Sequence, residues 1–339
     1  MPNKVKVEAN TASLAEHKLE DVLISKKGLD SGVSIKIPSL ERRVRDSLYE
    51  VYAFFKLGRN FSFKEPKYHY ISYKDGNGKE PQLLSSSELA KLDRTNKVRV
   101  VCISDTHERH ESVTIPPCDV FIHTGDILFV SRKKSLHCNL KKMEAFNLWL
   151  GALPATHKVV VAGNHDIPLE VLPRAHVTKL LSSAVYLCNQ AVVVEGLRLF
   201  GTPYSSGRSA NRAFQSKHYL QEARQELLKL HKSGSPVDLL LSHSDDMNPL
   251  DIAASSGSGA SSSGSGSNSD DGNGTQTIAR MLPKVHVWGH HHNKQGSQWL
   301  QQAQQSVLSA CAVIMTAEYE PVHPAMVIDF ERRAVRMSE

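Results

Sequence analysis

Five short apolar runs of this chain each end in side chains that can bind a metal ion. These side chains are Asp105 and His107 in "DTH", Asp126 in "GD", Asn164, His165 and Asp166 in "GNHD", His243 in "SH", and His290 and His292 in "GHHH". A single histidine after a strand is common in proteins without a metal. Five apolar runs in one chain that all end in potential metal ligands are uncommon. Carboxylate, amide and imidazole ligands without thiolates suit two divalent ions such as manganese, iron or zinc. Burying so many polar groups without a metal would be costly.

The spacing within two of these motifs indicates which of the neighbouring side chains point to the same side. In an extended segment, side chains two positions apart point to the same side. Asp105 and His107 would therefore face together, and so would His290 and His292. We expect the outer two histidines of "GHHH" to be ligands and His291 to point away.

The runs that carry these residues have the pattern of buried parallel strands. "VRVVCISDTH", "CDVFIHTGD", "HKVVVAGNHD", "VDLLLSHS" and "PKVHVWGHHH" are each mostly apolar and end in polar residues. Stretches with helical spacing lie between several of them, and one of these closes on Gly234. Alternating strands and helices predict an α/β fold, in which ligands bind at the carboxyl ends of strands.

The order DxH, GD, GNHD, H, GHxH resembles the calcineurin-like metallophosphoesterase superfamily over residues 98–339. The resemblance implies a sandwich of two central β-sheets flanked by helices. It also implies a dinuclear metal centre, in which a hydroxide between the metals attacks phosphorus in line. The implied ligands are Asp105, His107 and His292 for the first metal, Asn164, His243 and His290 for the second, and Asp126 as the bridge.

The same resemblance gives His165 the role of the catalytic histidine that protonates or stabilises the leaving oxygen. It suggests that Asp166 orients the His165 ring. Phosphoprotein phosphatases of the superfamily carry GD-x-x-D-R, whereas Phe129 stands here at the second Asp, and the next block is GNHD rather than GNHE. These departures argue against a protein phosphatase.

Three other stretches are similar to one branch of the superfamily. "IPPCDVFIHTGD", "LFGTPYSSGRSANRAF" and "EYEPVHPAMVIDF" resemble the metallophosphoesterase-domain-containing, or 239AB-like, branch, whose members are linked to hydrolysis of cyclic nucleotide phosphodiesters. Some animal members of the branch lose one histidine of GHxH and are poor enzymes. This chain keeps both.

Some polar residues near the motifs have two interpretations. His123 should lie on the face opposite Asp126, as a structural residue or one that supports a ligand. Asn211 and Arg212 could reach a substrate phosphate, or could stand at a solvated helix start.

Residues 1–97 lie outside the resemblance and are expected to form a separate module. Nine of the 22 aromatic residues fall between Tyr49 and Tyr73, enough for a small core. A strand, a helix over residues 39–55 and a hairpin about "DGNG" loosely resemble a β-grasp module of the PB1 type, which would recruit a protein partner. A packing extension without a partner explains the segment equally well. Residues 253–276 are rich in Ser and Gly and predict a flexible surface loop.

Composition narrows the class of protein further. No run approaches the roughly 20 apolar residues of a membrane helix, and we do not expect a secretory signal, because no apolar core follows the first basic residues. Five scattered cysteines without CxxC pairing are expected to be reduced, which favours a cytoplasmic or nuclear location. The net charge is +6, and residues 1–97 hold 18 basic against 13 acidic residues. The remainder is nearly neutral, which argues against a nucleic-acid substrate.

These observations lead to one main hypothesis and one alternative. The main hypothesis is a phosphoric ester hydrolase, with a phosphodiesterase favoured over a monoesterase and manganese as the expected metal. Its substrate would be a small phosphate ester, for example a cyclic nucleotide. The alternative is a metal-binding scaffold or interaction protein with vestigial catalysis.

Overall fold

The computed structural model describes residues 65–74, 80–129, 133–207, 211–247, 282–302 and 305–332. The chain divides into two units, Met1–Lys64 and Glu65–Glu339. The helix expected over residues 39–55, the turn at "DGNG" and the loop at residues 253–276 lie outside the described residues.

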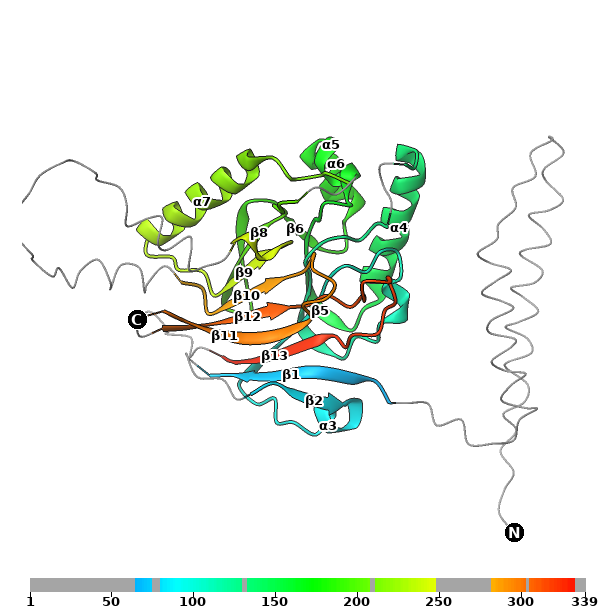
Figure 1. Ribbon diagram of the computed structural model, residues 1–339. Helices are drawn as coiled ribbons and strands as arrows, with labels where there is room; N and C mark the ends of the chain where they lie inside the picture. The colour runs from blue at the N-terminus through cyan, green and yellow to red at the C-terminus, as the bar shows by residue number, and fades with distance from the viewer. Residues whose placement is uncertain are drawn as a thin grey trace, which may run out of the picture. The chain divides into compact units, whose positions relative to one another are not determined.

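Seven strands form the first sheet in the order β2-β1-β13-β3-β4-β5-β6 (Figure 1). Their bounds are β1 Lys67–Tyr73, β2 Gln82–Ser85, β3 Lys97–Ile103, β4 Cys118–His123, β5 Ala155–Val161, β6 Val185–Leu187 and β13 Met326–Glu331. The consecutive pairs from β3 to β6 are parallel, as the apolar runs predict. Their polar motifs therefore emerge along one edge of the sheet.

Six strands form the second sheet in the order β11-β12-β10-β9-β8-β7. Their bounds are β7 Gln190–Val194, β8 Leu197–Thr202, β9 Leu239–Ser242, β10 Val285–Trp288, β11 Gly296–Gln302 and β12 Gln305–Cys311. β8, β9, β10 and β12 run parallel. The runs that end in His243 and in "GHHH" thus belong to a different sheet from the runs that end in Asp105, Asp126 and Asn164.

The two sheets pack face to face, and helices cover their outer faces (Figure 1). Val100, Ile122 and Val161 of the first sheet meet Leu241 and Val287 of the second in a buried core. Fully burying a side chain of this kind stabilises the fold by about 1.5–3 kcal/mol. α4 (Leu136–Ala152), α5 (Ile167–Val171) and α6 (Arg174–Leu180) cover the first sheet, and α7 (Lys217–Lys232) covers the second. The predicted sandwich of two sheets flanked by helices is confirmed.

Helix ends follow the local sequence. Ser135 accepts a hydrogen bond from Cys138 N at the start of α4, and Ser216 accepts one from His218 N at the start of α7. Gly234, with φ +71°, follows the end of α7, as predicted. The short elements are α3 (Ser86–Ala90), η1 (His110–Ser112) and η2 (Asp245–Met247). In the part of the chain that the structure describes, no helix is long and apolar enough to cross a membrane.

The boundary expected at residue 97 needs correction. β1 pairs in parallel with β13 from His69↔Met326 to Tyr73↔Phe330, so it is a strand of the first sheet. Tyr68 and Tyr70 are buried in the same core as the helices of that sheet. Aromatic residues that we expected in a separate core therefore pack on the main unit. The antiparallel pairing of β1 with β2 confirms a hairpin, but this hairpin extends the main sheet rather than a β-grasp module.

Candidate metal centre

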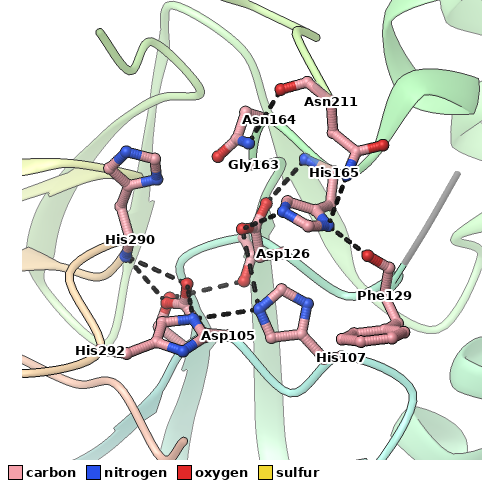
Figure 2. Close-up of polar contacts among 12 residues, drawn as sticks. Asp105, His107, Asp126, Phe129, Gly163, Asn164, His165, Asn211, His290 and His292 are labelled. Atoms are coloured by element: carbon pink, nitrogen blue, oxygen red, sulfur yellow. Dashed lines mark hydrogen bonds and ion pairs between the residues drawn. The ribbon is translucent and has the colours of Figure 1, made fainter. Parts of the chain in front are cut away.

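The polar motifs of both sheets converge on one cavity at the carboxyl ends of their strands (Figure 2). The cavity measures about 350 Å³ and is lined by Asp126, Asn164, His165, His290, His291, His292, Asn293, Ala317 and Tyr319. Three groups of side chains there could each hold a metal ion: Asp105 with His107 and His292, His107 with Asp126 and His165, and Asp126 with His243 and His290. Asp126 belongs to two of the groups and lies at the centre of the cluster.

Several residues of the site have left-handed backbone conformations that side chains disfavour. The φ angles are +56° at Asp105, +43° at His107, +57° at Asp126 and +69° at His290. Each such residue costs about 1–3 kcal/mol, which the surrounding hydrogen bonds must offset. Backbone strain of this kind concentrates at functional sites, which supports a functional role for these loops.

The assumption of an extended chain at "DTH" and "GHHH" is therefore wrong, although Asp105 and His107 do belong to one group, as expected. Because the backbone turns at His290, this residue and His292 go to different groups rather than to one shared face. His290 lies with Asp126 and His243, whereas His292 lies with Asp105 and His107. The middle histidine, His291, does turn to another partner and places its Nε2 2.9 Å from Asp245 Oδ1.

Two histidines direct their Nε2 atoms at each other. His107 Nδ1 lies 2.9 Å from the Leu128 carbonyl, and His292 Nδ1 lies 2.9 Å from the Thr316 carbonyl. A carbonyl oxygen only accepts, so each Nδ1 carries a proton, and in the neutral ring each Nε2 has a free lone pair. The two Nε2 atoms are 3.1 Å apart. In the neutral rings such lone pairs repel unless a cation lies beside them, so these residues fit a metal ion.

The second half of the cluster also pairs two potential metal ligands. His243 Nδ1 donates to the Thr124 carbonyl at 2.9 Å, and Asn164 Nδ2 donates to the Asn211 carbonyl at 3.0 Å. These bonds turn His243 Nε2 and Asn164 Oδ1 towards each other, 3.0 Å apart. Burial lowers the pKa of His243, but the carboxylates of Asp126 and then Asp105 outweigh burial and raise it to about 9. The site thus attracts positive charge, as a metal site should.

The His165 ring contacts a backbone carbonyl and an amide side chain rather than a carboxylate at Nδ1. This Nδ1 donates to the carbonyl of Phe129 and lies 3.1 Å from Asn211 Nδ2, and the His165 backbone N–H donates to Asp126 Oδ1 at 2.8 Å. Its Nε2 lies 3.8 Å from Asp126 Oδ2. The proton on Nδ1 leaves Nε2 as the nitrogen available for chemistry in the cavity.

The expectation that Asp166 orients the His165 ring is wrong. The buried Asp166 carboxylate accepts hydrogen bonds from the backbone N–H groups of Gly163 (2.9 Å), Ile127 (3.0 Å) and Leu128 (3.0 Å). Burial and the neighbouring Asp126 carboxylate raise the pKa of Asp166 to about 7, although the amide donors act in the opposite direction. Asp166 therefore joins the loop after β5 to the loop after β4.

Some contributors to the site were missed or left open by the sequence analysis. Tyr319, with φ +62°, packs its ring 4.9 Å from His107 and 4.8 Å from His292. The Asn211 backbone carbonyl orients Asn164, and its side-chain Nδ2 lies 3.1 Å from His165 Nδ1, so both of these contacts are with site residues. His123 is buried on the far side, with Nε2 3.0 Å from Thr106 Oγ1, which agrees with a supporting role. Tyr319 stands in a stretch that resembled the branch, but no local pattern marked its position.

Gly289 permits the close approach of the two sheets at the cluster. A Cβ atom at this position would lie 2.0 Å from Ser104 Oγ and 2.3 Å from Asp105 Oδ2. We expect Gly289→Ala to lower the free energy of unfolding by about 1–3 kcal/mol through overpacking, and to displace Asp105.

Urea unfolding and metal content of Gly289→Ala would be compared with those of Gly151→Ala. In Gly151→Ala the new Cβ atom lies in α4, 3.3 Å from Ser183 Oγ, and alanine favours the helix. Equal stability and equal metal content in the two variants would contradict the close approach.

Comparison with known proteins agrees with this architecture. The family model for calcineurin-like phosphoesterase matches residues 98–294, more than half of the chain. The chain therefore belongs to the calcineurin-like phosphoesterase family, whose members are phosphoric ester hydrolases.

The relatives define the branch. UPF0046 protein C25E10.12 of Caenorhabditis elegans is 31% identical over 218 residues, which cover 59% of this chain and 71% of the relative. Metallophosphoesterase domain-containing protein 1 of Homo sapiens is 29% identical over 254 residues, which cover 68% and 70%. These matches support the metallophosphoesterase-domain-containing branch. A solved protein of unknown function from Aquifex aeolicus, AQ665, is 20% identical over 43% of this chain, with a TM-score of 0.24, too low to bear on the fold.

Proposed function

We propose that the chain is a phosphodiesterase with a dinuclear metal centre. The observation that carries the proposal is the convergence of potential metal-ligand atoms on Asp126. In two pairs of side chains, His107 with His292 and His243 with Asn164, the facing ligand atoms lie within 3.1 Å of each other. Both pairs lie beside the Asp126 carboxylate, where two cations could be bound.

The proposed ligands divide into two sets that share Asp126. Asp105, His107 and His292 would hold one divalent ion, and Asn164, His243 and His290 the other. Manganese is the expected metal, and iron or zinc would accept the same donors. Two such ions, when bound, neutralise charge on the attacking and leaving oxygens and lower the pKa of a coordinated water.

The protein's own groups supply the remaining chemistry. His165 presents Nε2 to the cavity, where a protonated imidazole would give its proton to the leaving oxygen. Asp166 acts as a positioning residue because it fixes the loop that carries Asn164 and His165.

The cavity lining favours a diester over a monoester. Among the described residues that line it, none is lysine or arginine. A phosphate monoester brings up to two negative charges to the site, whereas a diester brings one. A site without added cationic side chains is better matched to the singly charged ester, for example a cyclic nucleotide.

The test is hydrolysis of bis-p-nitrophenyl phosphate against p-nitrophenyl phosphate by the purified full chain, stripped of metal and reloaded with manganese. We expect a kcat/KM for the diester at least about 10-fold above that for the monoester, a difference of about 1.4 kcal/mol in transition-state binding. Faster monoester hydrolysis would overturn the diester preference. If two metals bind per chain and neither ester is hydrolysed, the scaffold hypothesis is favoured.

Two further expectations accompany the proposal. A protein partner for residues 1–97 now concerns chiefly residues 1–64, since the hairpin of β1 and β2 belongs to the first sheet. A cytoplasmic or nuclear location rests on the cysteines, which are all free.

A further inference from the structure

The backbone that follows Asp126 is held by side chains on both sides. The N–H groups of Ile127 and Leu128 donate to Asp166, and the Leu128 carbonyl accepts from His107 Nδ1 at 2.9 Å. The next residue, Phe129, uses both of its backbone polar groups as well. This segment therefore connects the ligand loops with the residues that surround them.

Phe129 links His165 to a carboxylate outside the cluster. The Phe129 carbonyl accepts from His165 Nδ1, and the Phe129 N–H donates to Glu108 Oε1 at 3.2 Å. Glu108 forms an ion pair with Lys142 of α4. The chain of contacts runs from a helix on the outer face of the first sheet to the ring in the cavity.

The backbone conformation of Glu108 places its side chain near the Phe129 N–H. Its φ is +68°, a left-handed conformation that a glutamate rarely adopts. Its backbone N–H donates to the Ile127 carbonyl at 2.7 Å, which places the side chain beside Phe129. The Phe129 side chain is 41% exposed, so packing of the ring alone fixes this residue only in part.

We propose that Glu108, braced by Lys142, is a positioning residue that acts through the Phe129 backbone to hold His165 in its reactive tautomer. This inference deepens the proposed function and rests on it. In GD-x-x-D-R phosphatases a carboxylate occupies the place of Phe129. Here the Phe129 carbonyl accepts the hydrogen bond from His165 in place of that carboxylate, and Glu108 holds the Phe129 backbone. Because a carbonyl only accepts, this closer contact favours a proton on Nδ1 against the more distant Asn211 Nδ2, 3.1 Å away, and leaves Nε2 for the cavity.

The alternative is that Glu108 and Lys142 form only a stabilising ion pair. Both side chains are more than a quarter exposed, 27% and 28%. An exposed pair contributes about 0–1 kcal/mol to stability and has no effect on the tautomer of a distant ring. The two roles therefore differ in measurable ways.

The kinetic test compares two diesters that differ in leaving group, bis-p-nitrophenyl phosphate and diphenyl phosphate. A misplaced general acid slows the ester with the poorer leaving group more, since phenolate needs the proton more than p-nitrophenolate does. We expect Glu108→Ala to lower kcat about 10- to 30-fold for diphenyl phosphate and only about 2- to 3-fold for bis-p-nitrophenyl phosphate. Both losses are smaller than the ~10²–10⁴-fold rate increase that a general acid supplies, because His165 itself remains. KM should stay nearly constant.

Conservative variants sharpen the comparison. Glu108→Gln keeps an oxygen that accepts from Phe129 N–H, so it should restore most of the rate. Lys142→Met should lower kcat for diphenyl phosphate less than Glu108→Ala does. Its matched control is Lys141→Met, an exposed neighbour on the same helix, which should behave as the wild type.

A second measurement does not depend on turnover. Long-range ¹H–¹⁵N spectra of the full chain with labelled histidine, recorded after chelation of metals, report the tautomer of each ring. The His165 resonances are assigned by their absence in His165→Gln. We expect Nδ1–H alone in the wild type and a mixture of tautomers in Glu108→Ala.

The outcomes separate the two proposals. A wild type that hydrolyses neither ester overturns the proposed function and this inference with it. A wild type that hydrolyses both, with Glu108→Ala unchanged in tautomer or slowed equally on both esters, overturns only the role of Glu108. A changed tautomer together with a loss that depends on the leaving group supports it.

Discussion

Asp126→Asn should lower kcat by at least about 10³-fold and reduce bound metal below two ions per chain. Asp126 Oδ1 lies 3.3 Å from His243 Nε2, and Oδ2 lies 3.9 Å from His107 Nε2, so the carboxylate faces both candidate metal positions. Removing a shared negative charge weakens both positions. The 10³-fold fall in kcat corresponds to about 4 kcal/mol of lost transition-state stabilisation, at about 1.36 kcal/mol per tenfold change.

Asp126→Asn removes the negative charge of the side chain and keeps its shape. Asparagine has nearly the same volume as aspartate, and it tolerates the left-handed φ of +57° at this position. Its Oδ1 can still accept the hydrogen bond from His165 N, so the loop after β5 should keep its place.

Metal content by mass spectrometry, diester turnover and thermal unfolding would be measured on the same preparations. Asp93→Asn is the matched control, because Asp93 is exposed and its hydrogen-bond donor among the described residues is Thr95, in a turn. A variant that retains two metals and wild-type turnover would exclude Asp126 as the bridge.

The parts of the site that sequence could predict are those with a local pattern. Each ligand candidate follows an apolar run, and the structure confirms β3, β4, β5, β9 and β10 at those runs. Parallel strands align their carboxyl ends, which is why residues from Asp105 to His292 could be expected in one cavity.

The parts that sequence could not predict depend on non-local contacts or on the backbone. Alternation assumes an extended chain, but the left-handed turn at His290 sends His290 and His292 to different groups. The tautomers are set by backbone carbonyls such as those of Leu128 and Thr316, which leave no trace in residue type. The same applies to the Phe129 carbonyl, which took the place that we gave to Asp166.

The domain boundary shows how a local feature can mislead. The polar stretch "KLDRTNK" looks like a linker, but it is the turn between α3 and β3. β1 joins the sheet through β13, which lies about 250 residues later in the chain. A pairing over such a distance cannot be found from composition, and the aromatic residues of β1 were therefore counted with the wrong unit.

His165→Gln distinguishes a catalyst from a scaffold. The His165 ring lines the cavity with Nε2 available, and the substitution removes the group that would donate a proton to the leaving oxygen. We expect kcat for diphenyl phosphate to fall about 10²–10⁴-fold, the usual contribution of general acid catalysis, with two metals still bound. The matched control is His157→Gln, since His157 is exposed on β5 and its partner in the part of the chain that the structure describes is Glu195, at the surface.

The metal content of His165→Gln decides between two explanations of a lost rate. His165 also forms a group with His107 and Asp126 that could hold an ion, so a ligand role predicts loss of one metal together with activity. A general acid predicts a full metal complement and a loss that grows with the basicity of the leaving group, because the proton matters most for the poorest leaving oxygen. Turnover that survives in His165→Gln would contradict both roles and would leave the metal cluster to act without this ring.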